Sequence, residues 1–203
     1  MSSYVPLAAR FERIVSVLAS PPFLNMEGLG NEVPFFICAY APSEARAEPG
    51  LVSSLATRLR NQGIRVLEVN LYRLSIRLLQ NRGVLDSLIE QEPDLDPDQM
   101  LEPLRNVLNP EKHLVPAIGD LISEQRPQVM LVSGVGAVYP YLRSHTILNN
   151  LQDVAKGFPT VMFYPGEYTH TAEGGTSLRL FGILGDDRYY RAFNLDQYHL
   201  FGG

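Results

Sequence analysis

Short, continuous apolar runs alternate along the chain with segments in which apolar residues recur at helical spacing. The apolar runs of strand length are residues 33–40 (VPFFICAY), 64–72 (IRVLEVNLY), 128–134 (QVMLVSG) and 159–167 (PTVMFYPGE). The helical patterns cover residues 5–19, 51–63, 73–83 and 140–155. Strands that are apolar on both sides are typical of parallel sheets with two covered faces. The pattern therefore predicts an α/β fold, with a mainly parallel sheet of about four to six strands flanked by helices, an NTPase-like outline.

The stretch between the second and third predicted strands is helical throughout. Residues 84–126 form this helical insertion, and the segment 90–98 (EQEPDLDPD) within it holds five acidic residues and two prolines. We interpret the acidic segment as an exposed loop, with a contact for a basic partner as the alternative. We expect the whole chain, residues 1–203, to form a single α/β domain.

The C-terminal part has a weaker pattern. The Pro-Gly pair near the end of the fourth predicted strand indicates a turn, and the polar, glycine-bearing residues 168–177 predict a flexible loop. Two further apolar runs, 178–184 (LRLFGIL) and 189–195 (YYRAFNL), are separated by Gly-Asp-Asp. They predict a terminal hairpin or edge strands.

Composition narrows the class of protein. The chain has 203 residues, 45% of them hydrophobic, and no apolar run approaches the roughly 18–20 residues of a membrane span. Cys38, the single cysteine, cannot form an internal disulfide and lies in a strand-like run, so we interpret it as a buried small apolar residue. Charges interrupt the apolar pattern of the first twenty residues, which is unlike a signal peptide, so we expect a cytoplasmic protein.

A glycine-bearing turn after the third predicted strand raises the question of nucleotide binding. Residues 133–150 (SGVGAVYPYLRSHTILNN) read as a strand end, Gly134 and Gly136, and a helix, which is the outline of a phosphate site at a helix N-terminus. The groups that an NTPase needs are missing. The sequence has no Gly-Lys pair, and the strand ends in Ser133 where a metal-holding Asp would be required.

Other catalytic constellations are also missing from the sequence. Val138 or Tyr139 stands where a dinucleotide-binding turn needs its third glycine. The four histidines lack partners at metal-ligand spacing, and SGVG is not a G-x-S-x-G nucleophile elbow. We therefore predict a non-enzymatic protein with no ATPase activity, no metal and no cofactor. Gly136 is expected at positive φ, where valine would destabilise the fold.

Residues around this turn are candidates for a partner or ligand surface. Arg143 is expected to pair with Glu167 from the neighbouring strand end, with ligand binding as the alternative, and His145 lies on the apolar stripe of its helix. The turn ending at Tyr168 either simply ends the strand or forms a rigid platform for a partner. The candidate surface consists of Gly134, Gly136, Tyr139, Arg143, His145, Glu167 and Tyr168.

The net charge of −5 argues against non-specific binding of nucleic acid, which needs clustered Lys and Arg. The candidates for a local basic face are Arg58, Arg60, Arg65, Arg73 and Arg77. If they are only a solvated face, any binding of duplex DNA should be weak. If they form a stripe, the chain could instead be a nucleic-acid-binding subunit.

Three segments resemble the BrxB family, whose members are components of the BREX (bacteriophage exclusion) defence systems of bacteria. They are residues 23–40 (FLNMEGLGNEVPFFICAY), residues 133–151 (SGVGAVYPYLRSHTILNNL), and the C-terminal series PTVMFYPGEY, LRLFG and YYRAF. The similarity runs from about residue 10 to residue 195. In that family FYPGEY is usually followed closely by LRLFG, whereas here THTAEGGTS intervenes.

The resemblance implies a protein without an assigned catalytic activity. It implies association with PglZ, a protein of the alkaline-phosphatase superfamily, and a role in host-DNA methylation and phage restriction. Together with the missing catalytic groups, it favours a non-catalytic adaptor that binds PglZ within a BREX complex. The alternatives are a nucleic-acid-binding subunit and a small-ligand (nucleotide) sensor that uses the 134–143 turn.

Overall fold

A parallel sheet forms the centre of the computed structural model, which describes residues 5–29, 32–170, 176–182, 184–186 and 192–198. Its strands lie in the order β2-β3-β4-β1-β7, and every pair along this path is parallel. The strands are β1 Phe35–Tyr40, β2 Val66–Asn70, β3 Val129–Ser133, β4 Thr160–His170, β5 Thr176–Leu180, β6 Leu184–Asp186 and β7 Phe193–Asn194. The predicted α/β class and mainly parallel sheet are confirmed.

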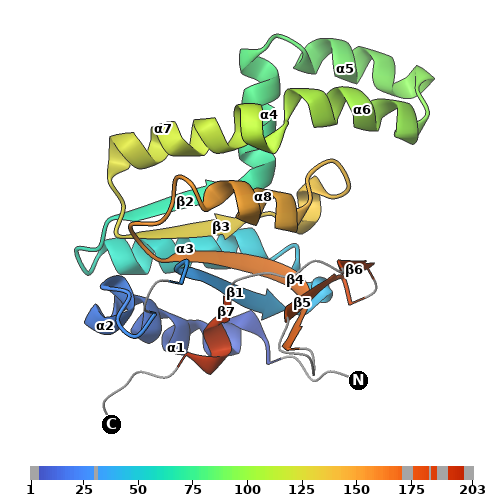
Figure 1. Cartoon of the computed structure of the whole chain (residues 1–203). Coiled ribbons are helices and arrows are strands. Elements are labelled where there is room, and N and C mark those ends of the chain that lie inside the picture. The colour runs from blue at the N-terminus through green and yellow to red at the C-terminus, as the bar shows by residue number, and fades with distance from the viewer. Residues whose placement is uncertain (1–4, 30–31, 171–175, 183, 187–191, 199–203) are drawn as a thin grey trace.

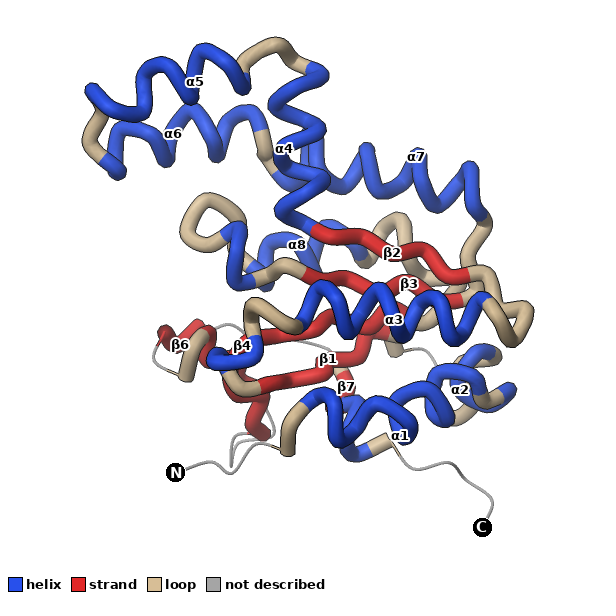
Figure 2. Tube along the Cα trace, turned by 180° about the vertical axis from the view of Figure 1, so that it is seen from behind, coloured by secondary structure: helices blue, strands red, loops and turns tan. Residues whose placement is uncertain are grey.

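Helices cover both faces of this sheet (Figures 1 and 2). One face carries α1 and α3, and the other carries α4, α7 and α8. The helices are α1 Leu7–Ala19, α2 Pro21–Leu24, α3 Glu48–Arg60, α4 Leu71–Asn81, α5 Leu85–Gln91, α6 Pro97–Val107, α7 Val115–Gln125 and α8 Ser144–Leu151. The helices α4 to α7 connect β2 to β3, which places the predicted helical insertion where the sequence puts it.

Two hydrophobic cores result from the alternation of side chains along each strand. On β1, Phe35 and Ile37 face the α4/α7/α8 layer, whereas Phe36 and Cys38 face the α1/α3 layer. Cys38 is fully buried, and burial raises the pKa of its thiol to about 12. The interpretation of Cys38 as a small buried core residue is therefore confirmed.

The fourth strand continues through the Pro-Gly pair that was expected to end it. β4 runs to His170, and its second half pairs antiparallel with β5, with Gly166 opposite Leu180 and Tyr168 opposite Leu178. The predicted turn is wrong because pairing with β5 keeps this segment extended. The predicted 168–177 loop is wrong at both ends, which are strand; residues 171–175 lie outside the described residues.

The last two apolar runs do not form a hairpin with each other. β6 folds back antiparallel on β5, through a bend at Phe181 and Gly182, and it includes the Gly185 that was expected in the intervening turn. β7 instead lies beside β1 at the other side of the sheet, with Phe193 opposite Phe36. The prediction of edge strands is correct for β7, and residues 187–191 lie outside the described residues.

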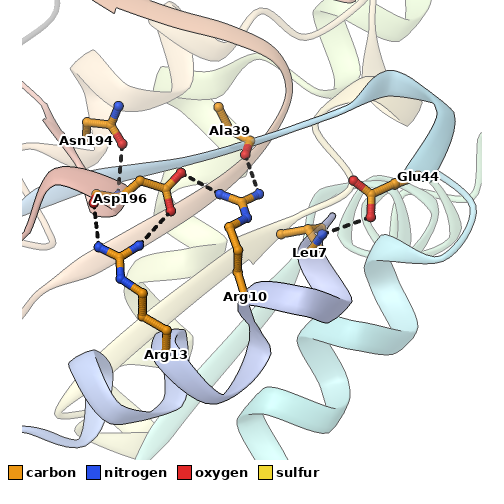
Figure 3. Close-up of polar contacts among 7 residues, drawn as sticks. All are labelled: Leu7, Arg10, Arg13, Ala39, Glu44, Asn194 and Asp196. Carbon is orange, nitrogen blue, oxygen red and sulfur yellow. Dashed lines mark hydrogen bonds and ion pairs between the residues drawn. The ribbon is translucent and has the colours of Figure 1, made fainter. Parts of the chain in front are cut away.

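A buried arginine fastens the C-terminal segment to the first helix (Figure 3). Arg10 on α1 is 8% exposed, and its Nη1 lies 2.5 Å from Asp196 Oδ2 while its Nη2 donates to the Ala39 carbonyl oxygen at 2.7 Å. Arg13 Nη1 contacts the other carboxylate oxygen of Asp196 at 3.2 Å. Glu44 accepts a hydrogen bond from Leu7 N–H at 2.9 Å and so satisfies the first turn of α1.

The helices α5 and α6 form a hairpin that stands away from the sheet (Figures 1 and 2). Leu88 is the only residue of α5 that is buried, and no residue of α6 is buried. The predicted acidic loop is shorter than expected, because residues Glu92–Asp94 form a 3-10 turn and α6 begins at Pro97. Asp96 caps α6 in a capping box with Gln99.

Within the described residues, no helix combines the length and apolar character that a membrane span requires.

Candidate functional site

The carboxyl ends of β2 and β3, at the edge of the sheet where α/β proteins bind ligands, are hydrogen-bonded to groups of the chain itself. Gly134, the residue after β3, donates its N–H to Glu48 Oε1 at 3.3 Å. Glu48 lies in the first turn of α3, after β1, and is only 1% exposed. The backbone N–H that the sequence offers to a phosphate therefore already has a carboxylate partner.

Burial dominates the electrostatics of Glu48. It raises the pKa of this carboxyl from an ordinary 4.5 to about 7, with a smaller upward effect from the Glu68 carboxylate. The hydrogen bond from Gly134 acts in the opposite direction, because it favours the charged form. Burial therefore moves the titration of Glu48 from the acidic range toward neutral pH.

Asn70 completes this row of internal contacts at the end of β2. Its side-chain oxygen accepts from Arg73 N–H at 3.0 Å and caps α4, and its side-chain nitrogen donates to Ser133 Oγ at 3.1 Å. Gly134 has φ +75°, and a Cβ there would lie 3.2 Å from Asn70 Oδ1. Gly134 is therefore a glycine for conformational reasons as well as for space.

The residues that follow the glycine turn also lack the geometry of a phosphate-binding site. Ten residues separate the end of β3 from α8, which begins at Ser144, and they include a 3-10 turn at Gly136–Val138 and a cis peptide bond between Tyr139 and Pro140. The predicted helix over residues 140–155 therefore starts four residues late. Its N-terminus does not follow the glycine turn directly, as a phosphate-binding helix would.

Gly136 does not have the positive φ that was expected; Gly134 has it instead. The constraint at Gly136 is space. A Cβ at this position would lie 3.0 Å from Pro165 Cγ and 3.1 Å from Phe181 Cε1. The same Phe181 ring makes an edge contact with Tyr139, with ring centroids 6.3 Å apart. The turn after β3 is thus packed against the point where β4 and β5 meet.

Replacing Gly136 by valine is expected to destabilise the fold by about 1–3 kcal/mol, because its side chain must displace Pro165 and Phe181. Thermal melts with Ala137→Val as control measure this, since Ala137 is the exposed neighbour. An unchanged midpoint in Gly136→Val, together with loss of a binding activity, would show that the turn is a ligand site.

The other candidate residues do not gather into one site. Arg143 is exposed, and its guanidinium lies 5.9 Å from the centre of the Tyr139 ring. Among the ion pairs of the described residues there is none between Arg143 and the half-buried Glu167, so that prediction is wrong. His145 is buried at 7% exposure, and Tyr168 is buried and donates its hydroxyl to the Ala192 carbonyl oxygen.

Sequence reasoning missed two buried charged residues. Glu48 lies between the predicted strand over residues 33–40 and the predicted helix over residues 51–63, and no local signal marks it as buried. Arg10 could have been found, because it stands three residues after Leu7 and four before Ile14, both of which are buried. An arginine on the apolar stripe of a helix needs an anionic partner, which here is Asp196.

Within the described residues, no three His, Cys, Asp or Glu side chains are grouped as metal ligands.

An arginine-lined groove follows the edge of the sheet at β2. A hollow of about 340 Å³ is bounded by side chains of α3, β2, α4 and α7, among them Arg60, Glu68, Arg73 and Arg77. A second hollow of about 420 Å³ continues toward the start of β2, where Arg65 lines it. The two share Arg60 and Gln125 as lining residues. Four of the five arginines singled out in the sequence therefore line this groove.

The fold and these contacts define a mainly parallel α/β protein in which internal hydrogen bonds occupy the ends of β2 and β3. The family model described as BREX protein BrxB matches residues 67–195. A BREX protein BrxB of Bacillus cereus (strain H3081.97) is 34% identical over 190 residues, which cover 92% of this chain and 95% of the relative. A BREX protein BrxB of Escherichia coli O9:H4 (strain HS) is 28% identical, over 93% and 91% of the two chains. The chain belongs to the BrxB family of the BREX phage-defence systems.

Proposed function

We propose that this chain is a non-catalytic adaptor of a cytoplasmic BREX complex, which binds PglZ and thereby supports host-DNA methylation and phage restriction. The observation that carries the proposal is the α5–α6 hairpin, a helical element whose surface is mostly left to solvent. We also propose that residues 1–203 form one domain, because the two cores share a single sheet.

The exposure of the hairpin calls for a partner. Helices of 7 and 11 residues are marginal in water without packing, yet α6 has no fully buried residue and packs the half-buried Met100, Leu104 and Val107 against the core. Ile89 on α5 is 57% exposed, so an aliphatic side chain projects from a polar surface. A preformed helical surface of this kind loses little conformational entropy when it docks.

The hairpin also concentrates the negative charge of the chain. Residues 85–107 contain seven acidic residues and one arginine, a net charge of −6, whereas the whole chain carries −5. The remainder is therefore close to neutral, at +1. A partner surface that is basic around an apolar centre fits such a hairpin, because charge complementarity speeds association and fixes orientation.

Some of the residues around the β3–α8 turn remain in the proposed partner surface. Tyr139, Arg143 and Glu167 are exposed or half-buried and can contribute contacts. His145 and Tyr168 are buried and support the fold beneath them.

The absence of the Gly-Lys pair and of the strand-end Asp supports a non-catalytic role. We expect no phosphate release from ATP with Mg²⁺ above a blank; turnover that changes with Gly134 and Arg143 variants would contradict this.

Binding of purified PglZ to the full chain tests the adaptor role. The double variant Ile89→Lys with Asp94→Lys should weaken binding at least tenfold, because it places charge on the apolar centre and removes part of the acidic rim. The matched control is Val5→Lys with Glu124→Lys, which changes an exposed aliphatic and an exposed acidic residue elsewhere. If the unmodified chain does not bind PglZ, the adaptor proposal is wrong. If the hairpin and control variants bind alike, the hairpin is not the contact.

The arginines at the β2 edge favour binding of nucleic acid as a second candidate function. They do not make a broad basic face. Arg58 lies 3.9 Å from Glu12, and Arg65 donates to the Arg126 carbonyl oxygen at 2.8 Å. We therefore expect duplex DNA to bind with a dissociation constant no tighter than about 10⁻⁵ M at physiological salt. Fluorescence anisotropy at two salt concentrations measures it. Tight binding that Arg73→Glu with Arg77→Glu abolishes would favour the nucleic-acid-binding reading over the adaptor.

A further inference from the structure

β2 is a terminal strand of the sheet (Figure 2), and the arginine-lined groove lies beside it. In the described part of the sheet, β2 pairs only with β3. The Arg65 carbonyl oxygen accepts from Gln128 N–H on the β3 side, and the N–H and C=O groups of successive residues in a strand point to opposite sides. The N–H and C=O groups of Val66 and Glu68 therefore face away from the sheet.

The two halves of this edge differ. At Val66, Arg60 Nη2 donates to the carbonyl oxygen at 3.0 Å, so a side chain already covers the edge there. Covering an edge with a charged side chain is a common way to block unwanted strand pairing. At Glu68 no such bond is present among the described residues, and the groove of about 340 Å³ lies beside this half. The outward N–H and C=O of Glu68 and the N–H of Asn70 are thus open to a further strand, whereas the Asn70 carbonyl oxygen accepts the first hydrogen bond of α4.

The charges beside the open half are mainly positive. Arg73 and Arg77 lie one turn apart on α4, are both exposed, and take part in none of the ion pairs between described residues. The Glu68 carboxylate is held by Ser53, whose hydroxyl donates at 3.0 Å, and Arg60 lies 3.9 Å away. An incoming segment therefore meets at least two guanidinium groups that lack an internal counter-charge.

We propose that the β2 edge docks an extended, acidic peptide segment of a partner protein, which adds a strand beside Glu68–Asn70 and places its carboxylates against Arg73 and Arg77. Strand addition supplies main-chain hydrogen bonds, and the arginines select the charge of the alternate side chains. Nucleic acid fits this edge less well. The sugar-phosphate backbone of DNA brings no donor for the outward Glu68 carbonyl oxygen, whereas a peptide backbone brings an N–H. The docking site is separate from the α5–α6 hairpin and does not depend on PglZ.

The test uses the full chain and a fluorescein-labelled decapeptide that alternates glutamate with threonine. Anisotropy should detect binding that weakens with salt and weakens at least tenfold in Arg73→Glu with Arg77→Glu. The control variant, Arg58→Glu with Lys156→Glu, makes the same charge change outside the groove and should bind as the unmodified chain does. Circular dichroism establishes that each variant is folded.

Two further probes separate strand addition from simple attraction of charge. The same decapeptide with every backbone nitrogen methylated keeps its charge but has no N–H left on either edge to pair with a strand, and it should bind at least tenfold more weakly. A labelled ten-nucleotide single-stranded DNA should bind more weakly than the unmethylated peptide. The proposal is overturned if the unmethylated peptide does not bind at millimolar concentration, or if methylation does not weaken its binding. It is also overturned if the groove variant and the control variant lose binding equally, or if the DNA binds more tightly than the peptide.

Discussion

Replacing Gly166 by alanine is expected to destabilise the protein by at least about 3 kcal/mol. Gly166 has φ +155°, and a Cβ built on its backbone would lie 2.1 Å from the Arg179 carbonyl oxygen and 3.0 Å from Phe181 N. Both contacts are with backbone, so no side chain can swing away, and β4 and β5 must separate where Gly166 pairs with Leu180. Strain of this kind costs about 1–3 kcal/mol for the dihedral alone, before the steric overlap is added.

Urea unfolding followed by circular dichroism measures this loss of stability. Gly157→Ala is the matched control, because a Cβ on Gly157 meets no atom within 4 Å and its φ is not in the left-handed region. The control should stay within about 0.5 kcal/mol of the unmodified chain. Equal stability of the two variants would show that the pairing of β4 with β5 at Gly166 is looser than the distances in the structure indicate.

Gly166 also illustrates why the C-terminal part of the fold was hard to predict. A Pro-Gly pair after an apolar run is a local turn signal, and locally the prediction was reasonable. What overrides it is pairing with β5, which lies beyond residues 171–175 in the sequence. β7 depends in the same way on a contact between Phe193 and Phe36 that no local pattern encodes. The central strands were predictable because each one is buried on both faces and therefore appears in the sequence as a continuous apolar run.

The candidate site was predictable in its parts and not in its arrangement. The sequence singles out the arginines as candidates, and the spacing of Arg73 and Arg77 places them on one helix face. Arg60 and Arg65 line the same groove because β2 is a terminal strand. Hydrophobic periodicity does not determine the order of strands in a sheet, so the sequence could not predict this arrangement. The internal use of Gly134 likewise requires Glu48, which is 86 residues away in sequence.

Glu48 leads to the second large expected effect, a pH-dependent gain in stability when it is replaced by glutamine. The pKa of this carboxyl is raised from 4.5 to about 7 in the folded chain, so the folded state binds more protons than the unfolded state between these pH values. The stabilising contribution of the protonated form is complete below about pH 4.5 and is lost as pH rises through 7. The free energy of unfolding should therefore fall over this window by up to about 3 kcal/mol on account of Glu48.

Glu48→Gln removes this decline, because an amide stays neutral at every pH and its oxygen can still accept from Gly134 N–H. We expect the variant to match the unmodified chain near pH 4.5 and to exceed its stability by up to about 3 kcal/mol at pH 8, which corresponds to roughly 6–12 °C in the midpoint of thermal unfolding. Melting curves at half-unit steps from pH 4.5 to 8 give the difference between the two proteins at each pH. Glu124→Gln, an exposed carboxyl on α7, serves as the control and should show no such divergence. A constant difference across the whole range would mean that the pKa of Glu48 is the same in the folded and unfolded chains, so that Gly134 N–H holds a carboxylate at neutral pH.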